Sequence, residues 1–349
     1  MSDSEDAVAL RRCAEDALGY WDLDLTNLRF VVAGENAVFR VSGRDGREFA
    51  VRVHRQGYHS LAELESENEW TTALNAAGIN TPRPVVTRMG SAYATVPFGS
   101  AGKTRQVGLV EWIDGVSLSD TISVEGSEPL TLYRDLGAVM ARIHEQAVSW
   151  TPSPGFVRHA LDAEGLIGDA PWWGPFWDVP EMTDADKAIV QAARHRMYQS
   201  LVGYGKRRGT YSLIHADLLP QNVLVCSGSP YVIDFDDAGY GWHQYDMAVA
   251  LFTVADHDEF LDYRDALVRG YRSVRPMSDD DLALLPMFIT IRSLAMVGWL
   301  HSRVSVELVR PSGERLSRIQ VLESNITRAV RRCRELLDST WLPAPPEQV

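Results

Sequence analysis

The sequence predicts an α+β protein of two lobes: a small β-rich lobe at residues 1–112 and a larger, mainly helical lobe at residues 113–349. Three observations support this division. The chain has 349 residues, which is more than a single domain usually holds. Short strand-forming runs separated by turn residues dominate as far as residue 112, and from about residue 115 the apolar spacing becomes helical.

The small lobe is expected to begin with a helix at 5–19, followed by strands at "LRFVVAG", "AVFRVSG" and "REFAVRVHR". Ser60 then opens a helix that Gly78 ends. Three further strands are predicted at "PRPVVT", "SAYATVPF" and "KTRQVGLVEWI". The stretch "FGSAGKT" at 98–104 ends like a phosphate-binding loop, but a strand follows it where that motif needs a helix, so we predict a hairpin turn.

The large lobe is expected to be helical except for one β-rich island at 211–234. Its helices are predicted at 130–148, 183–204, 243–255, 257–273, 279–300 and 314–337. The connection at 150–182 is unusually long and contains "PWWGPFWD" at 171–178. Two interpretations stay open for these aromatic rings: they hold a cation or a sugar ring of a substrate, or they anchor the insert to the helical lobe.

Charge and cysteine content restrict the function. The net charge of −13 makes the chain a poor candidate for nucleic-acid binding and is compatible with cationic partners. Three scattered cysteines without metal-ligand spacing are typical of a reducing compartment. Neither a signal-peptide pattern nor an apolar run of 18 residues is found, so we expect a cytoplasmic protein without a membrane partner.

The stretch "LIHADLLPQNVLV", residues 213–225, carries the chemical signal. It places His215, Asp217 and Asn222 between two strand-forming runs, and "YVIDFDDAG" then ends a strand with Asp234. Transfer of a γ-phosphoryl group requires a carboxylate that accepts the proton of the acceptor hydroxyl, and hard oxygen ligands for Mg²⁺. The spacing is that of a kinase catalytic loop and its metal-binding segment. It predicts Asp217 as the catalytic base, with Asn222 and Asp234 as metal ligands.

Together with "YVIDFDDAGYGWHQYDMA" and "VRVHR", this stretch resembles the aminoglycoside phosphotransferase and choline kinase family, with a pattern similar to the stress-response kinase A or homoserine-kinase-like branch. The resemblance implies a bilobal protein-kinase-like fold, with ATP and Mg²⁺ as cofactors. It also implies a structural role for His215. Asp246 matches an aspartate that braces the catalytic loop, although helix N-capping is an equally good interpretation of that residue.

The small lobe departs from the protein-kinase pattern in two places. "VVAGENAVFRV" has one glycine where a protein kinase has three, which leaves Asn36 as the candidate polar contact to phosphate. Arg52 stands where the phosphate-pairing lysine is usual, and its guanidinium can bind phosphate through two N–H groups. Glu67 is the expected ion-pair partner of Arg52. The competing candidates on the same helix are Glu63, Glu65 and Glu69.

The apolar joint "GLVEWIDG" between the lobes is expected to hold the adenine ring. Backbone groups from Glu111 to Ile113 would bond the edge of the ring. Because backbone recognition leaves little trace in side chains, the preference for ATP over GTP follows from the resemblance alone.

The acceptor is less clear from the sequence. Carboxylates greatly outnumber the single base, Arg264, across residues 234–265, which indicates either a site for a cationic substrate or the solvated face of a helix. We predict an ATP-dependent phosphotransferase that acts on a hydroxyl of a small molecule, a cationic one included. The alternatives are a Ser/Thr protein kinase of the stress-response type and a nucleotide-binding regulator without turnover. The presence of Asp217, Asn222 and Asp234 together argues against the regulator.

Overall fold

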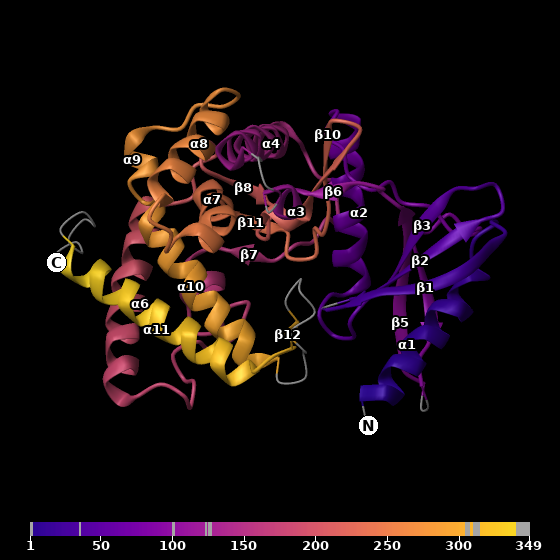
Figure 1. Ribbon diagram of the computed structural model, residues 1–349, viewed down its shortest axis with the longest axis horizontal. Helices are drawn as coiled ribbons and strands as arrows, with labels where there is room; N and C mark the ends of the chain where they lie inside the picture. The colour runs from indigo at the N-terminus through magenta and orange to yellow at the C-terminus, as the bar shows by residue number, and fades with distance from the viewer. Residues whose placement is uncertain are drawn as a thin grey trace. The chain divides into compact units, whose positions relative to one another are not determined.

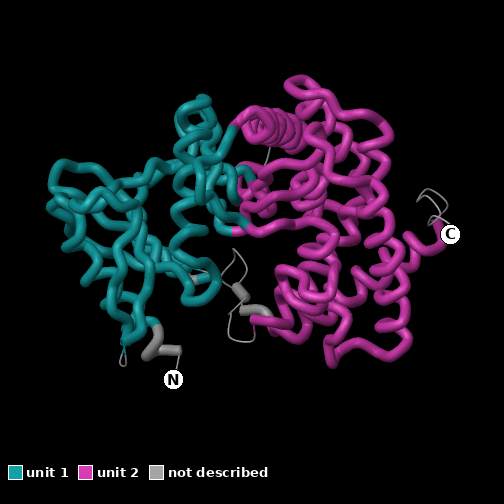
Figure 2. Tube along the Cα trace, turned by 180° about the vertical axis from the view of Figure 1, so that it is seen from behind, with its two compact units in different colours: residues 1–118, 151–158, 222–236 teal, residues 119–150, 159–221, 237–349 magenta. Residues whose placement is uncertain are grey.

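The computed structural model describes residues 3–34, 36–99, 102–122, 124, 128–303, 308–309 and 315–339. The chain forms two compact units (Figure 2). Unit 1 comprises residues 1–118, 151–158 and 222–236, and unit 2 comprises residues 119–150, 159–221 and 237–349. Each unit is therefore assembled from separate stretches of the chain. The lobe boundary expected between residues 112 and 113 stays a prediction.

Unit 1 is built on a five-stranded antiparallel sheet in the order β1-β2-β3-β5-β4 (Figure 1). Its strands are β1 (Leu25–Ala33), β2 (Ala37–Gly43), β3 (Glu48–Val53), β4 (Tyr93–Pro97) and β5 (Thr104–Glu111). Alternate residues of β2 are buried, as expected for a strand with one face in the core. Helix α1 (Asp3–Leu18) contributes Cys13, Ala14 and Ala17 to the same core as Phe39 and Phe49 of the sheet.

One predicted strand of this unit is wrong. "PRPVVT" forms only an isolated bridge, between Pro84 and Val110. Pro82 and Pro84 have no backbone N–H to donate, so this stretch cannot form a regular ladder. Pro97 pairs with Thr104 across β4 and β5, so a strand does follow "GKT" as expected. Residues 100 and 101 of the turn lie outside the described residues.

Helix α2 (Leu61–Ala76) follows β3 and is the helix that Ser60 was expected to open. The Ser60 hydroxyl accepts a hydrogen bond from the Glu63 N–H, and the Glu63 carboxylate accepts one from the Ser60 N–H at 2.8 Å. This reciprocal capping sets the first turn of the helix. A second sheet of unit 1, in the order β10-β9-β6, is formed by β6 (Val116–Ser117), β9 (Val223–Cys226) and β10 (Ser229–Val232).

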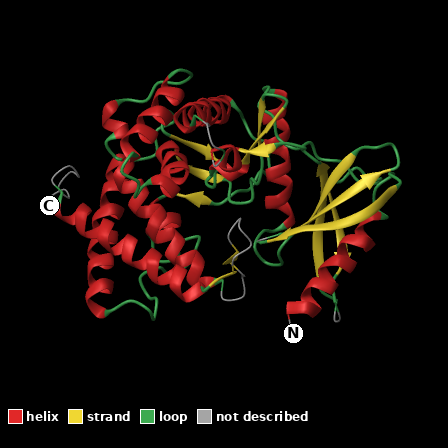
Figure 3. Ribbon diagram, in the orientation of Figure 1, coloured by secondary structure: helices red, strands yellow, loops and turns green. Residues whose placement is uncertain are grey.

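Unit 2 is mainly helical (Figure 3). Its longer helices are α4 (Pro129–Ser149), α6 (Asp184–Tyr204), α7 (His243–Leu251), α8 (Phe260–Arg272), α10 (Leu285–Ser302) and α11 (Arg318–Asp338). Shorter elements are α5 (Ala163–Ile167), the 3₁₀ turn η2 (Phe252–Val254) and the strand pair β12 (Leu308–Val309) and β13 (Arg315–Leu316). Helix α3 (Leu118–Ile122) begins at the residue that ends the first stretch of unit 1. A small sheet in the order β7-β11-β8 joins β7 (Ala160–Leu161), β8 (Tyr211–Ile214) and β11 (Gly239–Trp242).

The helix expected at 279–300 is interrupted. A short helix, α9 (Asp279–Leu282), precedes α10, which has Pro286 in its first turn, where a proline is tolerated. Within the described residues, the stretch Asp279–Ser302 is the one long and apolar enough to cross a membrane, and 67% of its apolar window is buried. Helices α7 and α11 pack against α10, which accounts for its nearly uniform apolar surface.

Candidate active site

The two candidate metal ligands lie at one end of the β9–β10 hairpin in unit 1. Val223 pairs with Val232, and the next pair continues this register because Asn222 accepts a backbone hydrogen bond from Ile233 at 2.9 Å. Asn222 and Asp234 therefore stand at the same end of the hairpin. Asp234 has a φ of 64°, a left-handed conformation that a non-glycine residue adopts at an energetic cost. Such strain is typical of functional sites.

Arg52, on β3, connects helix α2 to the segment that follows the β9–β10 hairpin. Its guanidinium donates to Glu67 at 3.3 Å and to Asp234 at 3.2 Å. Burial opposes the charge, but the carboxylates of Glu67, Asp234 and Asp236 outweigh it and raise the pKa of Arg52. Glu67, and none of its three competitors, is thus the glutamate bonded to Arg52 among the described residues.

Asn36 binds the protein's own side chains. Its Nδ2 donates to Asp236 at 3.1 Å, and its Oδ1 accepts from the Arg55 N–H at 3.2 Å. Asp236 is nearly fully buried, and burial alone would raise its pKa. Arg52, followed by His54 and His59, lowers that pKa overall. Asn36 therefore links the β1–β2 turn to the segment that carries Asp234.

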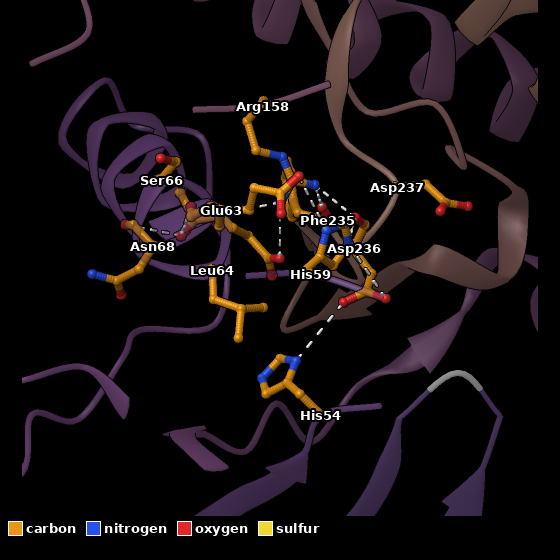
Figure 4. Close-up of polar contacts among 12 residues, drawn as sticks. His54, His59, Glu63, Leu64, Ser66, Asn68, Arg158, Phe235, Asp236 and Asp237 are labelled. Atoms are coloured by element: carbon orange, nitrogen blue, oxygen red, sulfur yellow. Dashed lines mark hydrogen bonds and ion pairs between the residues drawn. The ribbon is translucent and has the colours of Figure 1, made fainter. Parts of the chain in front are cut away.

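A strap formed by residues 151–158 holds this segment against α2 (Figure 4). The buried Arg158 guanidinium donates to the carbonyl oxygens of Phe235 at 3.2 Å, Asp236 at 2.6 Å and Glu63 at 3.2 Å. His59 also contacts the Asp236 carbonyl at 2.8 Å. Sequence reasoning missed both residues, since neither lies within a recognisable motif.

The predicted catalytic loop follows β8 in unit 2, and Asp246 supports its backbone. The Asp246 carboxylate accepts hydrogen bonds from the N–H groups of His215, at 3.0 Å, and Ala216, at 2.7 Å. Ala216 needs this support because its φ is 64°. Asp246 is fully buried within α7, so bracing is the correct interpretation of this residue and N-capping is wrong.

His144 extends the brace. Its Nε2 contacts Asp246 at 2.9 Å, and its Nδ1 contacts the Tyr271 hydroxyl at 3.0 Å. Burial, followed by the charge of Arg275, lowers the pKa of His144 well below its usual value, so the ring is neutral. Because a carboxylate only accepts, Nε2 carries the proton and Nδ1 accepts from Tyr271.

Asp217 itself is held by Arg292 of α10. Arg292 Nη2 donates to Asp217 Oδ1 at 2.7 Å, and the Arg292 side chain is 6% exposed. The catalytic loop and its immediate neighbours contain no lysine or arginine, so the sequence offered no local sign of this contact. The one available sign was a lone arginine in the apolar run "LPMFITIRSLAMVGWL".

At the expected adenine site, two of three amides are already engaged. The Glu111 N–H donates to Arg83 at 2.9 Å, and the Trp112 N–H donates to Glu48 at 3.0 Å. Of these three amides, that of Ile113 has no backbone partner among the described residues.

The tryptophan-rich segment behaves mainly as an anchor. Trp173 and Phe176 are buried, Trp172 stacks on His159 with ring centroids 3.7 Å apart, and the Arg194 guanidinium lies 3.9 Å from the Trp177 ring. These contacts fix the insert to unit 2.

The acidic stretch is partly committed to structure as well. Asp256 forms ion pairs with three arginines of α11, Arg328, Arg331 and Arg332, and Asp265 pairs with its neighbour Arg264. The ion pairs of Asp256 join the segment after α7 to α11, so this carboxylate serves the packing of unit 2.

Comparison with known proteins identifies the family of this chain. Residues 28–281 match the model of the phosphotransferase enzyme family. Amicoumacin kinase of Bacillus subtilis is 24% identical over 307 residues, 84% of this chain and 85% of the relative. A homoserine kinase of Gluconobacter oxydans is 29% identical over 224 residues, 61% of this chain and 62% of the relative.

Two solved structures are similar over almost the whole chain. A microcompartment-associated aminopropanol kinase has a TM-score of 0.79 at 30% identity, covering 95% of this chain and 98% of the other. An amicoumacin kinase in complex with AMP-PNP, Ca²⁺ and Ami has a TM-score of 0.74 at 19% identity, covering 95% of this chain and 94% of the other. The expected protein-kinase-like fold, kinase activity and small-molecule phosphotransferase function are confirmed, and the chain belongs to the phosphotransferase enzyme family.

Proposed function

We propose that this enzyme transfers the γ-phosphate of Mg²⁺-ATP to the hydroxyl of a small amino alcohol, with Asp217 as the catalytic base. The observation that carries the proposal is the braced loop, in which Asp246 fixes the strained backbone immediately before Asp217. The 30% identity to an aminopropanol kinase supports an acceptor that combines a hydroxyl with an amine. The net charge of −13 favours the approach of a cationic acceptor.

The residues divide the work of phosphoryl transfer between them. Asp217 would accept the proton of the acceptor hydroxyl as the hydroxyl oxygen attacks phosphorus. Arg52 would bind phosphate oxygens through its planar guanidinium, with Glu67 fixing its direction. The Ile113 N–H and the Glu111 carbonyl would bond the adenine edge. Asn36 would hold the β1–β2 turn over the phosphates through its bond to Asp236.

The donor set fits magnesium. Asn222 supplies an amide oxygen and Asp234 a carboxylate, both hard ligands, at one end of the β9–β10 hairpin. No cluster of three acidic, histidine or cysteine side chains suited to a metal occurs in the described ranges. This suits Mg²⁺, which usually takes one or two protein ligands and completes its shell with phosphates and water. When bound, the ion would neutralise phosphate charge. All three cysteines are free thiols, which supports a cytoplasmic location.

Release of ADP from Mg²⁺-ATP, measured across an acceptor panel, tests this proposal. The panel contains 1-amino-2-propanol, homoserine, choline, aminoglycosides and a generic protein substrate, each with the parent enzyme, Asp217→Asn and the exposed-site control Asp262→Asn. We expect turnover with a small amino alcohol, a loss of at least about 10³-fold in Asp217→Asn, and parent-like rates in the control.

Other outcomes of the panel would be equally informative. Turnover with the protein substrate alone would replace the proposal by the protein-kinase alternative. Small-molecule turnover that survives in Asp217→Asn would remove Asp217 as the base. A rate with choline or homoserine that exceeds the rate with amino alcohols would correct the acceptor class and leave the reaction type in place.

A further inference from the structure

The contact between Arg292 and Asp217 is unusual because it places a buried guanidinium on the candidate catalytic base. Nη2 of Arg292 lies 2.7 Å from Oδ1 of Asp217, a charge-assisted hydrogen bond. The side chains of Arg292 and Asp217 are 6% and 23% exposed. Both residues belong to unit 2, so the contact lies within one compact body.

The surroundings of Arg292 require a charged partner. Aromatic rings flank the guanidinium: its carbon lies 5.9 Å from the Trp173 ring and 6.0 Å from the Phe252 ring. Burial opposes its charge, but the neighbouring Tyr245, Asp217 and Asp237 outweigh burial and raise its pKa. Burying a cation in an apolar helix is expensive unless a carboxylate accompanies it. Asp217 therefore supplies the charged hydrogen-bond acceptor that this buried guanidinium needs.

The loop that carries Asp217 is fixed at two independent points. Asp246 holds the backbone through the N–H groups of His215 and Ala216. That brace leaves rotation about the side-chain bonds of Asp217 possible. Arg292, approaching from α10, limits this rotation by binding one carboxylate oxygen. The tryptophan-rich segment also helps to position Arg292, because the buried Trp173 ring lies beside the guanidinium.

We propose that Arg292 is a positioning residue for phosphoryl transfer, which holds the Asp217 carboxylate in the orientation that accepts the acceptor's hydroxyl proton. This inference rests on the proposed role of Asp217. Small displacements of a catalytic group reduce rates strongly because the reacting atoms must be aligned. Arg292 acts on the base and not on the nucleotide, so its loss should lower kcat and leave the KM for ATP nearly unchanged.

The test compares Arg292→Met, Arg292→Lys and Arg292→Ala by steady-state kinetics. The probes are Mg²⁺-ATP with 1-amino-2-propanol, and Mg²⁺-ATP with water as the acceptor, which needs no assumption about the substrate. We expect kcat to fall about 10²-fold in Arg292→Met, with the KM for ATP within about threefold of the parent. Arg292→Lys should keep only part of the parent kcat, because an ammonium group cannot reproduce the planar guanidinium contact. Added guanidinium ion should partly restore Arg292→Ala.

Arg332→Met is the matched control. Arg332, on α11, is also buried. It donates to Ser293 of α10, the helix that carries Arg292, at 2.6 Å, and to Asp256 at 2.8 Å. We expect both Arg332→Met and Arg292→Met to lose thermal stability, but only Arg332→Met to keep the parent kcat. The double variant Arg292→Met with Asp217→Asn should have the same kcat as Asp217→Asn alone, because both changes remove the same function.

Three outcomes would overturn the inference. The first is a parent-like kcat in Arg292→Met while Asp217→Asn is inactive, which would make Arg292 a purely structural residue. The second is an equal loss of kcat in Arg332→Met. The third is a rise in the KM for ATP that accounts for the whole effect. Where Arg292→Met does not fold, Arg292→Lys and the guanidinium rescue decide the matter. Activity in Asp217→Asn would instead contradict the proposed function on which the inference rests.

Discussion

At Asp234 the protein constrains both the backbone and the side chain of a single residue. The left-handed φ of 64° sets the direction in which the Asp234 side chain leaves the backbone. The Arg52 guanidinium then donates to the Asp234 Oδ1 at 3.2 Å. Arg52 therefore neutralises the carboxylate that we propose as a metal ligand. Binding of Mg²⁺-ATP would release Arg52 toward the phosphates and leave Asp234 to the ion. Arg52 and Asp234 can exchange each other for new partners because the phosphates are negative and Mg²⁺ is positive, so each side chain would keep an opposite charge beside it.

The variant Asp234→Asn tests this assignment through the magnesium dependence of ATP binding. We expect a loss of at least about tenfold in affinity for Mg²⁺-ATP, since a carboxylate is a far better ligand for Mg²⁺ than a neutral amide. Affinity for ATP in the presence of EDTA should stay equal or rise, because one negative charge beside the phosphates is gone. Calorimetric titration of both forms, with the exposed-site control Asp22→Asn, measures the difference. Unchanged Mg²⁺-ATP affinity would contradict the metal assignment.

At the level of secondary-structure elements, helix α2 is held by several hydrogen bonds from the strap at 151–158. Glu69 of α2 accepts hydrogen bonds from the N–H of Ser153, at 2.8 Å, and from its hydroxyl, at 2.6 Å. Ser66 accepts one from the N–H of Val157 at 2.8 Å. The strap at 151–158 thus follows the helix and ends in Arg158, which binds the segment that carries Asp234. Because α2 also carries Glu67, the strap and the helix together determine where Arg52 points.

Arg158→Met should weaken the attachment of the strap at 151–158 to helix α2 and to the segment that carries Asp234. The substitution removes the hydrogen bonds that Arg158 donates to the carbonyl oxygens of Glu63, Phe235 and Asp236 in a buried site (Figure 4). The Asp236 oxygen keeps its contact with His59. We expect a stability loss of about 3 kcal/mol, together with weaker binding of Mg²⁺-ATP because Asp234 loses its support. Urea denaturation and ATP titration measure the two effects. Arg88→Met, at an exposed position of the same unit, is the control. A stability loss without any change in nucleotide affinity would show that the strap does not position the metal segment.

At the scale of the whole molecule, burial keeps several histidines uncharged. Burial, followed by the charge of Arg52, lowers the pKa of His54 to about 3. Burial also lowers the pKa of His144 and of His243 well below the usual value, with Arg275 adding to the effect in both. His144 and His243 stack with ring centroids 4.3 Å apart, an arrangement that favours at most one proton between them. All three rings are therefore neutral in the folded protein at neutral pH.

These histidines predict a loss of stability in mild acid. Their folded-state pKa values lie below the unfolded value of about 6.5, so only the unfolded chain takes up their protons as the pH falls below 6.5. Stability should be constant above about pH 7 and fall between pH 6.5 and 5, by up to about 1.4 kcal/mol per pH unit for each histidine. Urea denaturation at a series of pH values measures the slope. His54→Gln should reduce that slope by one proton. A slope equal to that of the parent in His54→Gln would contradict the prediction.

Much of the site could be predicted from the sequence because its signals are local. The spacing of His215, Asp217 and Asn222 is confined to one loop, and Asp234 ends the next hairpin. The same local reasoning predicted the strands that carry Arg52 and Glu111, and most helix positions within a few residues. It failed at "PRPVVT", where β-branched residues indicated a strand but the prolines remove the donors that a ladder needs.

The reaction type and the main candidate residues can be predicted from the sequence, because the predicted catalytic loop carries them at fixed offsets. The tertiary structure alone decided what holds those residues in place. Arg292 binds Asp217 from 75 residues away, and Arg158 binds Asp236 from 78 residues away. It also decided that Asp256 serves the arginines of α11. Whether a buried charge finds a partner depends on which helices pack together, and a spacing along the chain does not contain that information.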